Sequence, residues 1–414
     1  MKIALVCDTM SAYGGAERVI EQILALYPTA DVFTVLDAVP PGQRGFLGGR
    51  EIRSTFLQRL PRVSKYYRKL LHLWPLAVEQ LDVMAYDLVI STHHSVAYGV
   101  LTRPGQVHVS YVFSPARYAW DLQHEYLREA GLDRGPLSLV ARHTLHKMRL
   151  WDYAAAQRPD AVAGCSRFVS ERMWRVHRRQ AEVIYPPVPA IARPAGVVRG
   201  DYYISVGRLV PYKRIELLAR AFSQMPGRRL KIVGTGPDLK KVAASCGPNV
   251  EMLGFRSNEE VRSLLAGARA FMFAGIEDFG ITAVEAQALG TPVIALADGG
   301  LRETVVGAPA SEATGLFFAE QSTQAVMDAV ERFERVRGGF TAEACIANAD
   351  RFSEEAFRTA FRAFVDRALK AEHTSPALMG SPRLPAGSAY GAPARVAGGL
   401  APAGSALHPG GVLS

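Results

Sequence analysis

Two glutamates flank the start of a helix that we expect in the second half of the chain. Glu277 precedes Gly280, and Glu285 lies about two turns into the helix, which ends at Leu289–Pro292 because proline cannot continue the turn. The first amides, from Ile281 onward, carry the positive end of the helix dipole and form an anion site. Gly280 lets a phosphate or sugar approach without a side chain in the way. The two carboxylates can then meet different parts of one long ligand, such as a nucleotide sugar. Two surface carboxylates at an ordinary helix start are the alternative.

This Glu-x7-Glu pattern, between a short strand and a glycine-started helix, resembles the signature of family 4 (group 1) glycosyltransferases of the GT-B fold. The resemblance implies that Glu277 holds hydroxyls of the donor sugar and that Glu285 holds those of the ribose. It also implies that a Gly-Arg-x4-Lys element, here with Arg208 and Lys213, supplies two cations to the diphosphate. Such cations stabilise the charge on the departing β-phosphate without a metal. Solvated surface cations are the alternative.

A glycine pair after the first strand of the chain is the next candidate. Gly14 and Gly15 stand where the resembling family places a glycine loop against the donor phosphates. The segment lacks the Gly-x-Gly-x-x-Gly pattern of dinucleotide-binding enzymes, so a nicotinamide dehydrogenase is not indicated. The resemblance extends from about residue 1 to residue 370.

Two segments, residues 91–97 and residues 111–121, resemble a bacterial polysaccharide subgroup that includes mannosyltransferases. His94 matches a histidine usual in the first segment, although packing or capping is an equally good role for it. The second segment contributes Arg117 and Asp121, which we assign to the acceptor side. Its family pattern has a histidine where this chain has Phe113, which leaves the identity of the sugar open.

Short β-branched runs alternate with longer helical patterns along the chain, which is typical of βαβ units and parallel sheets. The strands predicted in the first half are Ile3–Cys7, Val32–Leu36, Leu88–Ser91, Val107–Val112, Ala161–Gly164 and Val183–Tyr185. Those predicted in the second half are Tyr202–Val206, Leu230–Val233, Val250–Leu253, Ala270–Phe273 and Pro292–Leu296. A proline-rich stretch from Pro186 indicates a linker. The fold class is therefore α/β, with two Rossmann-like domains whose parallel sheets face each other across a cleft, as the GT-B resemblance implies.

These patterns set the expected domain boundaries. We place an acceptor domain at 1–188, a donor domain at 197–350, a helix that braces the pair at 351–372 and a tail at 373–414. The bracing helix is predicted over Glu354–Leu369, with Ser353 as its N-cap and phenylalanines at helical spacing. The tail is dominated by Ala, Gly, Pro and Ser and has no acidic residue, so we expect it to be disordered.

Composition and net charge limit the class of protein and the partners that we expect. A chain of 414 residues exceeds what one core usually supports, and 49% hydrophobic with 21% charged residues is an ordinary globular balance. The net charge of +9 suits an anionic substrate, a membrane surface or nucleic acid. No RNA-module signature is present, so we expect no nucleic acid partner. Four scattered cysteines favour a reducing cytoplasm.

No two aspartates are separated by one residue, so we expect no metal site and no cofactor beyond the nucleotide diphosphate sugar as co-substrate. No apolar run approaches the ~20 residues that span a bilayer, and the first strand is too short for a signal peptide. Any membrane contact is expected to be peripheral. The segment Arg50–Trp74 has seven basic residues against Glu51 alone, interleaved with aromatic residues such as Tyr66 and Tyr67. This pattern is typical of a basic helix at an anionic membrane surface, with a solvated helix over the core as the alternative.

Together these patterns predict a retaining, metal-independent glycosyltransferase that moves a sugar from a nucleotide diphosphate donor to a glycan acceptor. Our best guess is mannose from GDP-mannose, a lipid-linked acceptor, and a role in cell-surface polysaccharide or lipopolysaccharide assembly at the inner face of the plasma membrane. By resemblance, the acceptor hydroxyl attacks on the face that the diphosphate leaves. The alternatives are another GT-B enzyme, such as a phosphorylase or an epimerase, and a catalytically silent nucleotide-sugar-binding protein, which Phe113 would suit.

Overall fold

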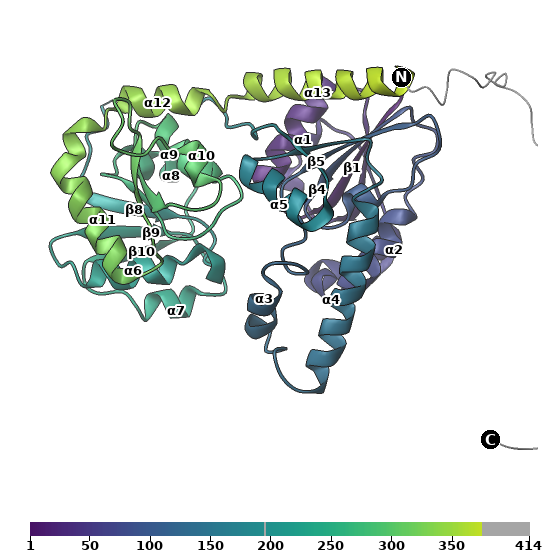
Figure 1. The fold of residues 1–414 in the computed structure, drawn as a ribbon. Coiled ribbons are helices and arrows are strands. Elements are labelled where there is room, and N and C mark those ends of the chain that lie inside the picture. Colours follow the sequence, from purple (N-terminus) through teal and green to yellow (C-terminus); the bar gives the residue numbers. More distant parts are fainter. Residues whose placement is uncertain (194–195, 375–414) are drawn as a thin grey trace, which may run out of the picture. The chain divides into compact units, whose positions relative to one another are not determined.

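Two sheets of parallel strands organise the chain. The computed structural model describes residues 1–193 and 196–374 (Figure 1). Within this part of the chain, seven strands form the first sheet in the order β3-β2-β1-β4-β5-β6-β7, and six form the second in the order β10-β9-β8-β11-β12-β13. Every neighbouring pair is parallel. The predicted α/β class with two parallel Rossmann-like sheets is confirmed.

The strands and helices alternate in sequence. The first sheet is built from β1 (Ile3–Met10), β2 (Asp31–Asp37), β3 (Ile52–Ser54), β4 (Leu88–His93), β5 (Val107–Val112), β6 (Ala161–Gly164) and β7 (Glu182–Val183). Its helices are α1 (Gly15–Leu26), α2 (Trp74–Glu79), α3 (Gln123–Glu129), α4 (Pro136–Ala155) and α5 (Arg167–His177). The second sheet is built from β8 (Tyr202–Val206), β9 (Arg229–Val233), β10 (Val250–Gly254), β11 (Phe271–Phe273), β12 (Val293–Leu296) and β13 (Gly315–Phe318). The remaining helices are α6 (Ile215–Ser223), α7 (Leu239–Ala243), α8 (Asn258–Ala266), α9 (Ile281–Ala288), α10 (Leu301–Thr304), α11 (Thr323–Val336), α12 (Ala342–Asp350) and α13 (Glu354–Thr374).

The differences from the predicted strands lie at the sheet edges. β3 was not predicted because its three residues, Ile52–Ser54, include only one apolar residue. β13 was also missed. The last strand of the first sheet ends at Val183, so the prediction that it reaches Tyr185 is wrong. Tyr185 leaves the sheet because its ring packs against Phe279 and Phe352, with centroids 5.8 and 5.1 Å away.

The basic helix predicted over Arg50–Trp74 is also wrong. This segment contains β3 and three short 3-10 turns, η3 (Phe56–Arg59), η4 (Val63–Lys65) and η5 (Tyr67–Leu73). Its aromatic residues contact the core: Trp74 is buried, and Tyr66 and Tyr67 pack against the same apolar cluster. An inward-facing Trp74 cannot insert into a membrane surface.

Helix α13 ties the end of the described chain to the first domain. It begins at Glu354 as predicted and continues to Thr374, and the Ser353 hydroxyl accepts a hydrogen bond from the amide of Ala356, as expected of an N-cap. Phe357 and Phe361 are buried against Tyr111 of β5, although the helix follows the second domain in sequence. In Figure 1, α13 (yellow-green) lies beside α1 (purple). The tail that we predicted to be disordered lies, from residue 375 onward, outside the part of the chain that the structure describes.

We predict that Phe361→Ala lowers the free energy of unfolding by about 3–5 kcal/mol, because it leaves a cavity among fully buried rings. Arg362→Ala, one residue away on the exposed side of α13, serves as the control and should change stability by no more than about 0.5 kcal/mol. Urea unfolding followed by circular dichroism makes the comparison. Equal stability of the two variants would show that α13 does not contribute to the first domain's core.

Candidate functional site

A cavity of about 380 Å³ opens where the carboxyl ends of the two sheets meet. Open parallel sheets bind ligands at this edge. The first domain lines it with residues that follow β1, β4, β5 and β6, and the second domain with residues around β8, β11 and α9. Its lining residues are Gly15, Ala16, His94, Phe113, Ser114, Cys165, Pro186, Val206, Lys213, Phe271, Phe273, Glu277, Asp278, Phe279, Gly280, Ile281, Thr282, Ala283 and Leu301.

Helix α9 points its N-terminus at this cavity. Gly280 adopts a left-handed conformation (φ 90°) and the helix begins at Ile281, so the predicted glycine-started helix is present. A Cβ atom at Gly280 would lie 2.7 Å from Leu301 Cδ1, which leaves no room for a side chain. The first amides of a helix lack partners within it and carry the positive end of its dipole. This end of α9 is suited to an anionic ligand group.

Helix α1 of the first domain meets α9 across the cavity. A Cβ atom at Gly15 would lie 2.6 Å from Ile281 Cδ1, so the two helix starts approach closely and a side chain at this position would require Ile281 to move. Gly14, the residue before the helix, does not line the cavity, and its amide donates to the Glu17 carboxylate at 3.0 Å. Two positive helix ends therefore converge on one space, which favours a multiply charged anion.

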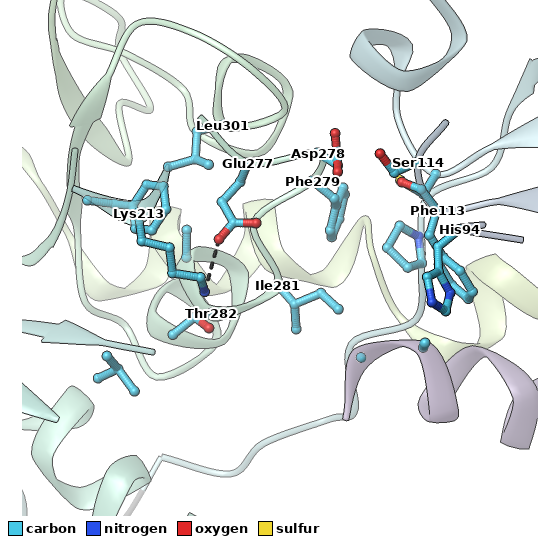
Figure 2. Close-up of a pocket in the computed structure, with 18 of the residues that line it drawn as sticks. His94, Phe113, Ser114, Lys213, Glu277, Asp278, Phe279, Ile281, Thr282 and Leu301 are labelled. Atoms are coloured by element: carbon cyan, nitrogen blue, oxygen red, sulfur yellow. Dashed lines mark hydrogen bonds and ion pairs between the residues drawn. The ribbon is translucent and has the colours of Figure 1, made fainter. Parts of the chain in front are cut away.

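An ion pair between Lys213 and Glu277 crosses the second domain's side of the cavity. The Lys213 ammonium lies 3.0 Å from Glu277 Oε1, with the two side chains 17% and 21% exposed (Figure 2). Lys213 comes from the turn η7 (Pro211–Lys213) after β8, and Glu277 from the loop before α9. The pair places a cation that can contact a phosphate next to a carboxylate that can accept sugar hydroxyls.

His94, Phe113 and Ser114 form the opposite wall, as Figure 2 shows. His94 is held by Asp8, whose carboxylate accepts the His94 amide at 2.6 Å and lies 3.2 Å from Nδ1. Asp8 is buried and also accepts the amides of the next three residues, so it fixes the turn after β4. The sequence interpretation missed this carboxylate, although its position directly after the predicted strand Ile3–Cys7 was a signal.

Cys165 lies beside Phe113 in the same wall. Burial raises the pKa of the Cys165 thiol well above its ordinary value, so the thiolate needed for nucleophilic attack is disfavoured. Its thiol instead donates to the Phe113 carbonyl oxygen at 3.1 Å. Cys165 is therefore a packing residue.

A buried charge cluster joins the two domains next to Glu277. Asp278 accepts from Arg172 at 2.7 Å and from Arg117 at 3.3 Å, and Arg172 also forms a double hydrogen bond with Asp121. Burial raises the pKa of Asp278, and the two guanidinium groups act in the opposite direction. Arg117 and Asp121, predicted on the acceptor side, thus belong to this cluster and do not line the cavity.

Two further contacts connect the domains. Glu285 does not line the cavity but pairs with Arg18 of α1 at 2.5 Å. Glu303 of α10 accepts the amides of Arg167 and Phe168, the first residues of α5, at 2.8 and 2.9 Å. No sequence pattern pointed to these partners, because such pairs depend on how the two domains meet.

Arg208, a predicted site residue, lies outside the cavity. Its side chain is exposed, does not line the cavity and has no hydrogen-bond or ion-pair partner within residues 1–193 and 196–374. Gly15, His94, Lys213, Glu277, Gly280 and Ile281 are the predicted residues that the cavity brings together. In the described part of the chain, no group of three or more His, Cys, Asp or Glu residues is arranged to hold a metal ion. None of the helices described there has the length and apolarity needed to cross a membrane.

Comparisons with known proteins bear on this arrangement of two parallel Rossmann-like sheets. The Anabaena protein HepE, crystallised with UDP, superposes with a TM-score of 0.65 at 18% identity over 89% of this chain and 100% of that one. This likeness confirms the predicted GT-B fold. Residues 195–352 match the family model "Glycosyl transferases group 1". The matched residues make up less than half of the chain, and this region is similar to the group 1 glycosyltransferases.

Curated relatives match part of the chain. A segment of 186 residues is 33% identical to the D-inositol 3-phosphate glycosyltransferase of Mycobacteroides abscessus and covers 42% of this chain and 41% of that protein. A segment of 124 residues is 36% identical to a GDP-mannose-dependent monoacylated alpha-(1-6)-phosphatidylinositol monomannoside mannosyltransferase of Corynebacterium glutamicum, covering 26% and 31%. The matched segment thus spans less than half of each of these two relatives.

We predict that Asp278→Ala opens the two domains. The closed arrangement loses about 3–5 kcal/mol, because Arg117 and Arg172 are left buried without their shared carboxylate. Small-angle X-ray scattering should then show a larger radius of gyration than for the wild type. Asp328→Ala removes an exposed carboxylate from α11 and should leave the radius unchanged. A radius that is equal in both variants would mean that the cluster does not hold the domains together.

Proposed function

We propose that this protein is an active glycosyltransferase that takes its sugar from a nucleotide diphosphate donor. The observation that carries the proposal is the Lys213–Glu277 pair beside two converging helix N-termini. This arrangement offers positive charge for a diphosphate and a carboxylate for sugar hydroxyls within one cavity. HepE, which shares the fold, was crystallised with UDP and with UDP-glucose, and this supports the donor class.

In the proposed complex the diphosphate lies between the starts of α1 and α9, close to Gly15 and Gly280. Lys213 leaves Glu277 to contact the phosphates, and Glu277 then accepts hydroxyls of the donor sugar. Arg208 is exposed and without a partner among the described residues, so its side chain is free to reach the diphosphate from outside the cavity. Glu285 exchanges Arg18 for the ribose hydroxyls.

The proposed reaction retains the anomeric configuration. The acceptor oxygen forms a bond to the anomeric carbon on the face where the bond to the β-phosphate oxygen breaks, and that oxygen takes the acceptor's proton. Lys213, Arg208 and the amides of α9 stabilise the charge that develops on the nucleoside diphosphate. Because these groups are all part of the chain, the proposed reaction needs no metal ion.

The donor sugar, the acceptor and the location are finer parts of the same proposal. We propose mannose from GDP-mannose as the donor, supported by the match to a GDP-mannose-dependent enzyme. The proposed acceptor is a lipid-linked glycan in cell-surface polysaccharide or lipopolysaccharide assembly. The reaction would take place in the cytoplasm at the inner face of the membrane.

We predict that Lys213→Ala lowers kcat by about 10²–10³-fold, because the lost cation meets charge that grows as the diphosphate leaves. Glu277→Ala should abolish transfer, since it removes the contact to the reacting sugar. Lys240→Ala on α7 is the control for Lys213→Ala, and Glu251→Ala on β10 is the control for Glu277→Ala. Each removes an exposed charge of the same sign as its test variant, elsewhere in the second domain. Steady-state kinetics separate the roles. A raised KM at normal kcat in Lys213→Ala would assign that residue to donor binding alone.

The proposal as a whole is tested with a panel of nucleotide sugars. The protein is incubated with each donor and a membrane extract as the acceptor source, and sugar transfer is followed with and without EDTA. We expect transfer from one donor, GDP-mannose in our assignment, with a rate that EDTA leaves unchanged. Transfer that stops with EDTA and returns with Mg²⁺ would contradict the metal-independent reaction. Release of sugar phosphate on addition of inorganic phosphate would instead indicate a phosphorylase.

A further inference from the structure

The outward face of α4 carries an unusual set of side chains. Leu137, Leu139 and Val140, at the start of this helix, are 67%, 71% and 62% exposed, and Leu150 and Tyr153 are exposed further along. The opposite face packs on the first domain through Leu145 and Met148 among others. A helix that packs on a domain normally presents a polar face to solvent, so α4 departs from the expected pattern. An exposed apolar patch of this kind marks an interaction site.

The charge on this face is positive. Its exposed polar residues include His143, His146 and Lys147, and the acidic residue of the helix, Asp152, is fully buried. Asp152 bonds inward to Trp120 and His177 and does not reach the surface. The outward face of α4 therefore combines large apolar side chains with basic ones and has no exposed carboxylate.

Two carboxylates lie near the start of α4. Asp133 precedes the helix and is 3.7 Å from the Arg134 guanidinium. Burial raises the pKa of Glu129 of α3, as do Glu125 and Asp238, whereas Arg214 and Lys241 of the second domain act to lower it. Figure 1 shows the start of α4 at a tip that lies away from the sheet of its own domain. The apolar start of α4 is thus accessible to an extended flat surface.

We propose that the outward face of α4 docks the protein on an anionic lipid bilayer, with Leu137, Leu139 and Val140 inserted among the headgroups. Charge complementarity favours this occupant, because the exposed Lys147 is attracted to anionic lipid and no exposed carboxylate on this face opposes it. A second copy of the chain is disfavoured: a stable dimer buries about 800 Å² on each partner, more than a few side chains on one helix tip supply. The inference extends the proposed lipid-linked acceptor and rests on it, and it replaces Arg50–Trp74 as the membrane surface.

Co-sedimentation with vesicles of phosphatidylglycerol and phosphatidylcholine, beside pure phosphatidylcholine vesicles, tests the proposal. The wild type should bind the anionic vesicles, less strongly as salt rises. Leu137→Gln/Leu139→Gln/Val140→Gln should bind at least ~100-fold more weakly, because three apolar side chains no longer leave water. The matched control is Leu101→Gln/Phe255→Gln/Val336→Gln, which changes three exposed apolar residues elsewhere and should bind like the wild type. Circular dichroism checks that each variant is folded.

The outcomes separate the competing explanations. Loss of binding in Arg62→Glu/Lys65→Glu/Lys69→Glu, with normal binding of the α4 variant, would return the membrane surface to the Arg50–Trp74 segment and overturn the proposal. Dimerisation of the wild type without vesicles that the α4 variant abolishes would assign the face to a second copy. Donor hydrolysis without vesicles is measured in parallel. Normal hydrolysis with no vesicle binding would overturn only the docking surface, whereas vesicle binding without hydrolysis or transfer would overturn only the proposed function.

Discussion

The convergence of positive charge on one cavity is the constraint on which the rest of the structure depends. Two helix starts and the Lys213 ammonium lie at a cavity lined by both domains. Without an anion these groups repel one another. Glu277 offsets it in the ligand-free protein by pairing with Lys213. In the proposed complex the same carboxylate becomes available to the donor sugar once the diphosphate has taken over the lysine, which would couple donor binding to the arrangement of the site.

Three contacts between the domains have the same distribution of charge. In the three contacts that involve Asp278, Glu285 and Glu303, the carboxylate comes from the second domain and the cation or amide from the first. Asp278 meets Arg117 and Arg172, Glu285 meets Arg18, and Glu303 caps the start of α5. Complementary charge of this kind guides the two surfaces into one register more than it adds raw affinity. Because Asp278 directly follows Glu277, the position of the sugar-facing carboxylate depends on the first domain being in place.

The sequence was sufficient for features that arise within one element and its neighbours. The strands from β1 to β12 largely coincide with apolar runs, and Gly280 marks the start of α9, because these depend on local period and backbone conformation. The partners of Asp278 could not be found in this way, since Arg172 comes from a helix more than 100 residues earlier. The prediction for Arg50–Trp74 was wrong for a related reason. The charges and aromatic residues of this segment suit a helix, but Tyr66, Tyr67 and Trp74 contact the domain core. Long-range packing determined the backbone there.

The carboxylates at the cavity also bear on how an intermediate could form. A double displacement needs a nucleophile that is ionised and free to attack the anomeric carbon. Of the two carboxylates that line the cavity, Glu277 is paired with Lys213, and Asp278 is held by two arginines whose release would separate the domains. The Cys165 thiol is disfavoured as a thiolate by its burial. In the proposed complex Lys213 has left Glu277, whose carboxylate would then accept the sugar hydroxyls, so neither carboxylate would be free to attack. This supports the direct attack by the acceptor that we propose.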